Sequence, residues 1–109
     1  MTDVFVVLVT APTGEKAHEI ARDLVEKNLA ACVNIVAGVR SVYRWEGAIQ
    51  DDQEDLLVIK TSRARLPESI ARVREVHPYS VPEVVALPVE AGHADYLAWV
   101  LAETRPAEP

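Results

Sequence analysis

The stretch "GVRSVYRWEG", from Gly38 to Gly47, decides how this chain folds. In an extended strand its side chains alternate between two faces, one with Val39, Ser41, Tyr43 and Trp45 and the other with Arg40, Val42 and Arg44. The pair Glu46-Gly47 predicts a tight turn, and Gly38 predicts a bulge or a bend. A second strand is expected from Ile49 to Ser62, ending in "DLLVIKTS". The stretch therefore predicts the outer part of a long β-hairpin that begins near Ala30.

Helical and strand patterns alternate on both sides of this hairpin. The aliphatic run 3–11 predicts a buried strand, and "VVALPV" at 84–89 predicts the last strand. A first helix is expected from about Thr13 to Lys27, capped by Thr13 and closed by Asn28. Its predicted inward residues are Ala17, Ile20, Ala21, Leu24 and Val25. A second helix is expected over 66–76, with Ile70, Val73 and Val76 facing inward, and a third over 93–104.

This order predicts an α+β, ferredoxin-like (βαββαβ) fold. We expect an antiparallel four-stranded sheet, two helices on one of its faces and an added C-terminal helix. The length of 109 residues fits a single domain over 1–109, with a frayed tail from about 104 to 109.

The hairpin is too long for a domain of this size. Sixteen residues from Ala30 to Trp45, at about 3.3 Å each, span roughly 50 Å, whereas a small domain is about 30 Å across. The tip must therefore overhang or bend, and it carries Tyr43 and Trp45, which are poor residues for a solvated arm. We expect a homo-oligomer in which each hairpin lies on a neighbour. The alternative is a curled, bulged hairpin within one monomer.

Composition and charge limit the classes of partner. The formal net charge is −6 and the acids cluster over 46–55, while basic residues are scattered singly, which argues against nucleic acid. The charge is compatible with a metal cation, although solubility is the simpler explanation. No apolar run is long enough to predict a membrane span. One cysteine, Cys32, excludes an internal disulfide and favours a reducing, cytoplasmic compartment.

The segment "HPYSVPE", from His77 to Glu83, is either a stiff connector or a small ligand site. Pro78 ends the second helix and Pro82 leads into the last strand. His77 is expected to bond nearby backbone or Glu83. In the functional interpretation, His77 and Glu83 converge as nitrogen and oxygen ligands of a divalent ion. Two ligands make a weak site, so a third would come from a neighbour or from water.

The remaining candidates for chemistry are few. His18 is expected on the exposed side of its helix, His93 at a helix terminus, and Cys32 as a buried thiol. No nucleophile elbow, phosphate-binding glycine loop or zinc-ligand spacing occurs, so we predict a non-enzyme with no required cofactor. Lys60 stands among aliphatic residues, where it either pairs with an acid or contacts an anionic ligand in a cleft.

Taken together, five stretches resemble the CutA divalent-cation tolerance family: "VTAPTGEKAHEIARDLVEKNLAACVNIV", "GVRSVYRWEG", "LLVIKT", "HPYSVPEVVALPV" and "YLAW". The match covers the chain from about Val4 to Thr104. The resemblance implies a ferredoxin-like subunit in a homotrimer, a link to tolerance of copper and other divalent metals, and a cytoplasmic location in bacteria. It also implies a trimer architecture similar to that of the nitrogen-regulatory PII signalling proteins.

The chain departs from the copper site proposed for that family. The family site uses a cysteine just before the "TAP" segment and two adjacent histidines before "PY". Those positions are Val9 and the pair Val76-His77 here, so His77 alone matches. At most, a weak histidine and carboxylate site for Cu²⁺ or another divalent cation carries over.

Three functions follow as hypotheses. The first is a homotrimeric, non-enzymatic divalent-metal-binding or tolerance protein with His77 and Glu83 as ligands. The second is a PII-like effector-binding trimer, in which Trp45, Lys60, Tyr79 and Glu83 line a cleft between subunits and Lys60 favours an anionic ligand. The third is a scaffold for another protein.

Overall fold

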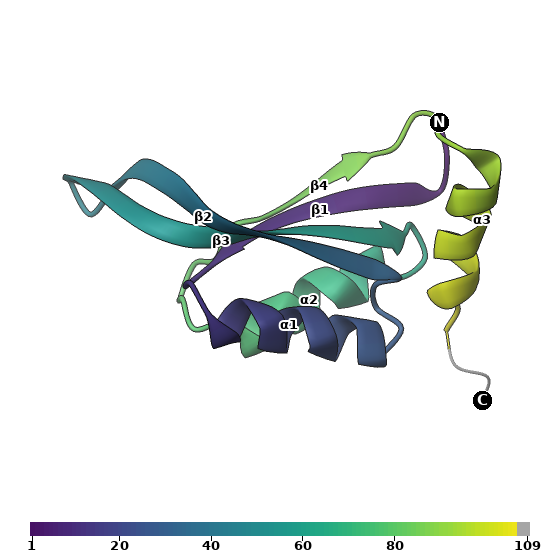
Figure 1. The fold of residues 1–109 in the computed structure, drawn as a ribbon, viewed down its shortest axis with the longest axis horizontal. Coiled ribbons are helices and arrows are strands. Elements are labelled where there is room, and N and C mark those ends of the chain that lie inside the picture. The colour runs from purple at the N-terminus through teal and green to yellow at the C-terminus, as the bar shows by residue number, and fades with distance from the viewer. Residues whose placement is uncertain (107–109) are drawn as a thin grey trace.

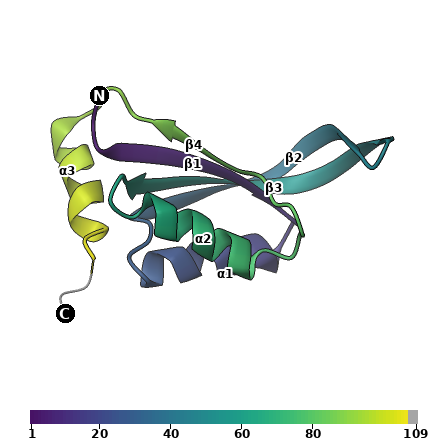
Figure 2. The same ribbon diagram turned by 180° about the vertical axis from the view of Figure 1, so that it is seen from behind.

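The computed structural model describes residues 1–106 and confirms the predicted order of strands and helices (Figure 1). In chain order the elements are β1 (Val4–Ala11), α1 (Glu15–Glu26), β2 (Cys32–Trp45), β3 (Ala48–Ser62), α2 (Leu66–Val76), β4 (Val84–Pro88) and α3 (Ala94–Glu103). The strands form one antiparallel sheet in the order β2-β3-β1-β4. Helices α1 and α2 cover one face of it, and α3 lies at one end (Figure 2). This is the expected ferredoxin-like arrangement.

The core lies between the sheet and the two helices. Its buried cluster of aliphatic side chains includes Val7, Val9, Ile20, Leu24, Leu57, Ile59 and Val73. Alternate residues of β1 and β3 enter this cluster, as their period of two predicts. The prediction that Val25 faces inward is wrong, since its side chain is exposed. On a helix Val25 lies about 100° from Leu24, which puts it at the edge of the apolar stripe.

The start of α1 differs from its prediction. Gly14, and not Thr13, is the N-cap, and no side chain caps the helix. Gly14 has a φ of 96°, a conformation that an L side chain rarely adopts, so glycine fits this turn. The end of the helix agrees with its prediction, because Asn28 follows it with a φ of 56° in the left-handed region.

The β2–β3 hairpin projects from the end of the molecule opposite α3 (Figure 1). Strand β1 ends with Ala11 paired to Asp55, so the hairpin beyond that point has no third strand beside it. The pairing shifts between Val36 and Val39, and this confirms the bulge predicted at Gly38. Trp45 pairs with Ala48 around the predicted turn. The hairpin therefore bends and overhangs, and the chain measures 44 × 30 × 22 Å.

Asp55 ties the base of this overhang to the start of α1. One carboxylate oxygen accepts the Gly14 amide at 3.1 Å, and the other accepts the Gly38 amide at 3.2 Å. The residue is buried. One side chain thus fixes both the α1 turn and the bulge.

Helices α1 and α2 are joined by an ion pair between Asp23 and Arg72. The guanidinium Nε and Nη2 reach the two carboxylate oxygens at 2.8 and 3.0 Å. This two-point contact lowers the pKa of Asp23 to about 2, aided by Lys27 and opposed by partial burial.

The C-terminal helix is better anchored than the sequence indicates. Thr104, at the start of the segment predicted to fray, is buried and donates its hydroxyl to the Val100 carbonyl at 2.8 Å. The side-chain amide of Asn28 also donates to the Glu103 backbone carbonyl at 3.0 Å. Positions 107–109 of the predicted tail lie outside the described residues. Over residues 1–106, no helix has the length and apolarity needed to cross a membrane.

Candidate functional site

The segment from His77 to Glu83 leaves the end of α2 and leads to β4. His77 is the C-cap residue of α2, with an extended conformation, and its amide donates to the Val73 carbonyl at 2.9 Å. Pro78 disfavours the helical conformation at His77, which explains why α2 ends there.

The His77 ring is buried and both of its nitrogens are used. The Tyr79 amide donates to Nδ1 at 3.1 Å, so Nδ1 carries no proton. The neutral ring then holds its proton on Nε2 and donates it to the Thr10 carbonyl at 2.7 Å. The ring fastens the connector to β1, and a metal ion at either nitrogen would have to break one of these bonds.

Tyr79 extends this network to β3. Its ring lies 4.7 Å from the His77 ring, and its hydroxyl donates to Glu54 Oε2 at 3.1 Å. Burial and the negative charge of Glu54 both disfavour ionisation of the phenol, and they raise the pKa of Tyr79 to about 12. A second tyrosine–carboxylate pair lies nearby. The Tyr43 hydroxyl donates to Asp52 Oδ2 at 2.9 Å, and this bond raises the pKa of Tyr43.

A cavity of about 720 Å³ opens between the overhanging hairpin and the 79–83 connector. Its walls combine aromatic, acidic and small polar side chains, namely Thr10, Ser41, Val42, Tyr43, Trp45, Asp52, Glu54, Tyr79, Ser80, Val81 and Glu83. The charged residues in this wall are all acidic. Cross-strand register explains the grouping, because Ser41 pairs with Asp52 and Val39 with Glu54.

Within one chain, the structure brings together three of the four residues that were predicted to line a cleft between subunits, a prediction that one chain does not test. Trp45, Tyr79 and Glu83 line the cavity, but Lys60 does not. Lys60 pairs with Cys32 at the other end of the hairpin, and its ammonium donates to the Asn34 side chain and the Val58 carbonyl. Within one chain, therefore, the cleft lacks the basic group that would favour an anion.

Of the predicted metal pair, Glu83 lines the cavity and His77 does not. Glu83 faces the cavity, whereas the His77 ring is hydrogen-bonded to Thr10 and to Tyr79. Over residues 1–106, no three histidine, cysteine or acidic side chains form a group able to hold a metal ion. The role of His77 as a ligand stays a prediction.

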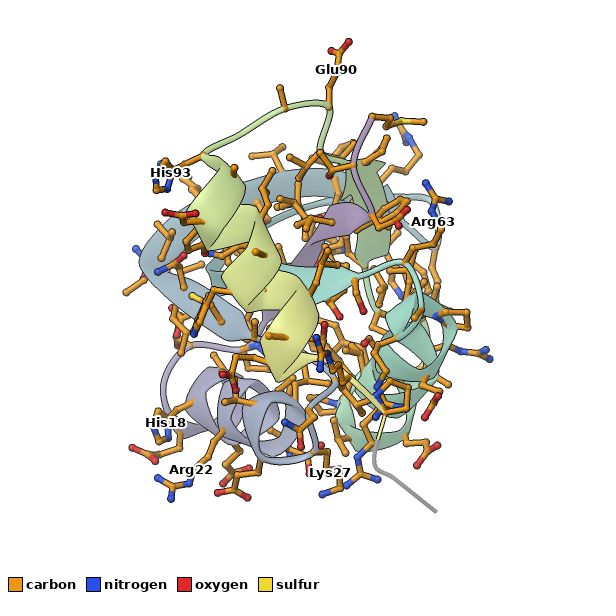
Figure 3. All side chains as sticks on the ribbon, turned by 90° about the vertical axis from the view of Figure 1, so that its right-hand side faces the viewer. His18, Arg22, Lys27, Arg63, Glu90 and His93 are labelled. Atoms are coloured by element: carbon orange, nitrogen blue, oxygen red, sulfur yellow. The ribbon has the colours of Figure 1, made fainter. Side chains whose placement is uncertain are left out.

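The other predicted candidates lie apart from the cavity. His18 is exposed on α1, and His93 is exposed at the N-cap of α3, at the end of the molecule opposite the hairpin (Figure 3). Cys32 was expected in the core but is only half-buried, with its sulfur 3.9 Å from the Asn34 side chain.

Sequence reasoning did not identify Tyr43, Asp52 and Glu54 as parts of a site. The acidic run was attributed to solubility. The useful signal was the alternation of β3, which puts Asp52 and Glu54 on one face, opposite Ser41 and Val39 on the partner strand, and Tyr43 follows on that same face of β2.

Comparison with known proteins identifies the family. The model of the CutA1 divalent ion tolerance protein matches residues 5–103. The chain belongs to the CutA1 family. A divalent-cation tolerance protein CutA of Thermus thermophilus is 52% identical over 99 residues, covering 91% of this chain and 96% of that protein. Human protein CutA is 52% identical over 92 residues, covering 84% of this chain but 51% of the human protein. The chain therefore spans about half the length of that relative.

Solved CutA structures share the fold. The T. thermophilus divalent cation tolerance protein superposes with a TM-score of 0.91 at 50% identity, covering 94% of this chain and 99% of the other. A PII-like protein CutA from a Nostoc species gives 0.88 at 34% identity, covering 94% and 99%. Val9 and Val76, which replace two residues of the family's proposed copper site, have packing roles. Val9 is fully buried in the core, and Val76 packs against the core cluster.

Proposed function

We propose that this CutA1-family chain is a homotrimeric, non-enzymatic cation-binding protein of divalent-metal tolerance. The observation that carries the proposal is the cavity beside the hairpin, whose charged lining consists of Asp52, Glu54 and Glu83. Carboxylate oxygens suit divalent cations, and the T. thermophilus relative is named a divalent-cation tolerance protein.

The carboxylates of this cavity suit a cation that prefers oxygen ligands, and they suit Cu(I), which prefers sulfur ligands, less well. Valine occupies both positions where the family's proposed copper site has cysteine and histidine, and Cys32 lies at the far end of the hairpin. Cu²⁺ or another divalent ion would use Glu83, with His77 joining once its bond to the Tyr79 amide opens. One chain leaves this set incomplete, so a neighbouring subunit or water would complete it.

Exposed apolar side chains support the trimer. The overhanging hairpin exposes Val42 and Ile49, and α3 exposes Tyr96, Trp99 and Leu101. Both edge strands, β2 and β4, can pair with another chain. Contact between subunits would bury these groups. A cytoplasmic location agrees with the single free thiol of Cys32.

Light scattering and calorimetry test the proposal. We expect the mass of three chains, and binding of Cu²⁺ or Zn²⁺ that weakens in Glu83→Gln and His77→Ala. The exposed His18→Ala variant is the matched control and should bind as the wild type does. A monomer in solution, or metal binding unchanged in both site variants, would contradict the proposal.

A PII-like effector function is the second candidate. Its support is the cavity volume, which lies in the range of small-molecule sites, and the fold shared with a relative described as PII-like.

A further inference from the structure

Glu54 is a buried charge that lacks a cationic partner. The residue is 5% exposed, and over residues 1–106 no lysine, arginine or histidine lies within ion-pair distance of it. The Tyr79 hydroxyl satisfies one oxygen but brings no positive charge. A buried carboxylate without a counter-charge is costly, so its cavity is suited to a positively charged group.

Aromatic rings form the rest of the cavity's recognition surface. Tyr43 and Trp45 come from β2, and Tyr79 comes from the connector. Each is between 40% and 44% exposed, so part of each side chain remains open. The faces of tyrosine and tryptophan attract ammonium groups, and several such faces around one cation form an aromatic cage.

Size separates an organic cation from a bare metal ion. A space of about 720 Å³ far exceeds what one metal ion needs and matches pockets for small molecules. Asp52 and Glu54 each have one oxygen already bonded to a tyrosine hydroxyl. An ammonium group needs a nearby negative charge and aromatic contact, and it does not need a complete ligand shell.

We propose that this cavity binds a small organic ammonium ion, with Glu54 and Asp52 supplying the counter-charge and Trp45, Tyr43 and Tyr79 the aromatic wall. The inference rests on the proposed cation-binding function and names an additional ligand class for the same site. The ligand proposed here is a cation, whereas Lys60 led us to expect an anionic ligand. Lys60 lies outside the cavity.

Tryptophan fluorescence of the full-length protein tests the inference, with choline as the probe. The chain has two tryptophans, and Trp99→Phe leaves Trp45 as the reporter inside the cavity. The neutral carbon isostere of choline, dimethylbutanol, has the same shape without the charge. We expect saturable binding of choline and at least about tenfold weaker binding of dimethylbutanol.

Substitutions assign the effect to the cavity. Glu54→Gln should weaken choline binding by about tenfold or more, because it removes the buried charge and keeps the shape. Glu90→Gln is the matched control, since Glu90 projects from the end of the molecule opposite the hairpin (Figure 3), and it should change nothing. Trp45→Leu, followed by calorimetry, is a second variant if Glu54→Gln does not fold.

Three results would overturn the inference: no saturable choline binding, equal binding of choline and dimethylbutanol, or unchanged binding in Glu54→Gln. A cavity already filled by a basic side chain of a neighbouring subunit would give the first result. Parallel titration with Zn²⁺ separates the two proposals. Zinc binding without choline binding refutes the organic ligand alone, whereas failure of both cations refutes the proposed function as well.

Discussion

Replacing Asp55 with alanine should be among the most damaging single changes at the base of the hairpin. The carboxylate accepts two backbone amides, from Gly14 and from Gly38, and each bond has an ionised acceptor. Hydrogen bonds to charged groups contribute roughly 1.5–3 kcal/mol each. Both glycines are exposed, so water can partly replace the lost acceptor. We therefore take the lower end of that range and expect a loss of about 3 kcal/mol in the free energy of unfolding.

Urea denaturation, followed by circular dichroism, measures this loss. Asp55→Asn keeps one acceptor oxygen and should lose about half as much. Asp51→Asn is the matched control, because Asp51 lies on the same strand in an exposed pair with Arg40, and such pairs contribute little to stability. A loss below about 1 kcal/mol in Asp55→Ala, or an equal loss in the control, would refute the role assigned to Asp55.

Four further substitutions test the energetics of individual side-chain contacts. The Asp23–Arg72 pair lowers the pKa of Asp23 from 3.8 to about 2. Its contribution to stability is therefore complete above a pH of 3.8 and is lost as the pH falls through about 2. Asp23→Asn should make the urea midpoint less dependent on pH over that interval, and an unchanged acid profile would contradict this. The pKa of Tyr79 is raised from 10.0 to about 12, so the stability of the protein should fall as the pH rises through that interval. Stability should fall less in Tyr79→Phe, and alkaline denaturation curves of the two proteins measure the difference. The buried Ser62 hydroxyl has no partner over residues 1–106, so Ser62→Ala should stabilise the protein by up to about 1 kcal/mol. Ser69→Ala, which removes bonds to two carbonyls, should destabilise it by about 1–2 kcal/mol, and thermal melts that fail to separate the two serine variants would contradict both assignments.

The sequence predicted the fold well because its signals are local. Alternation in β1 and β3, the Glu46-Gly47 turn and the helical spacing of Ile70, Val73 and Val76 each depend on neighbouring residues, and together they define one order of elements. The bulge at Gly38 was also predictable, since glycine interrupts a strand pattern there. The cap of α1 was mispredicted because Asp55, 41 residues away, bonds the Gly14 amide and so replaces a local cap.

The site was harder to predict because its contacts join distant parts of the chain. His77 bonds Thr10 across 67 residues, and Tyr79 bonds Glu54 across 25. No spacing rule reports such contacts. The position of Lys60 could not be predicted for the same reason. The sequence shows its charge, but it does not show that Lys60 lies at the opposite end of β3 from the cavity. The grouping of Trp45, Tyr79 and Glu83 was predicted, and the acidic character of the cavity around them came from the structure.

The position of β1 in the sheet has a consequence for synthesis of the protein. β1 is synthesised before the other three strands, yet it is a central strand, paired with β3 on one side and β4 on the other. Its partner residues in β4 come about 80 positions later, as in the pair Phe5 and Pro88. The β2–β3 hairpin is local and can form early, and β3 can then pair with one edge of β1, whereas the other edge of β1 must wait for β4. During translation the nascent chain therefore carries an aliphatic strand with one open edge until β4 is made, and this edge is exposed to pairing with other chains.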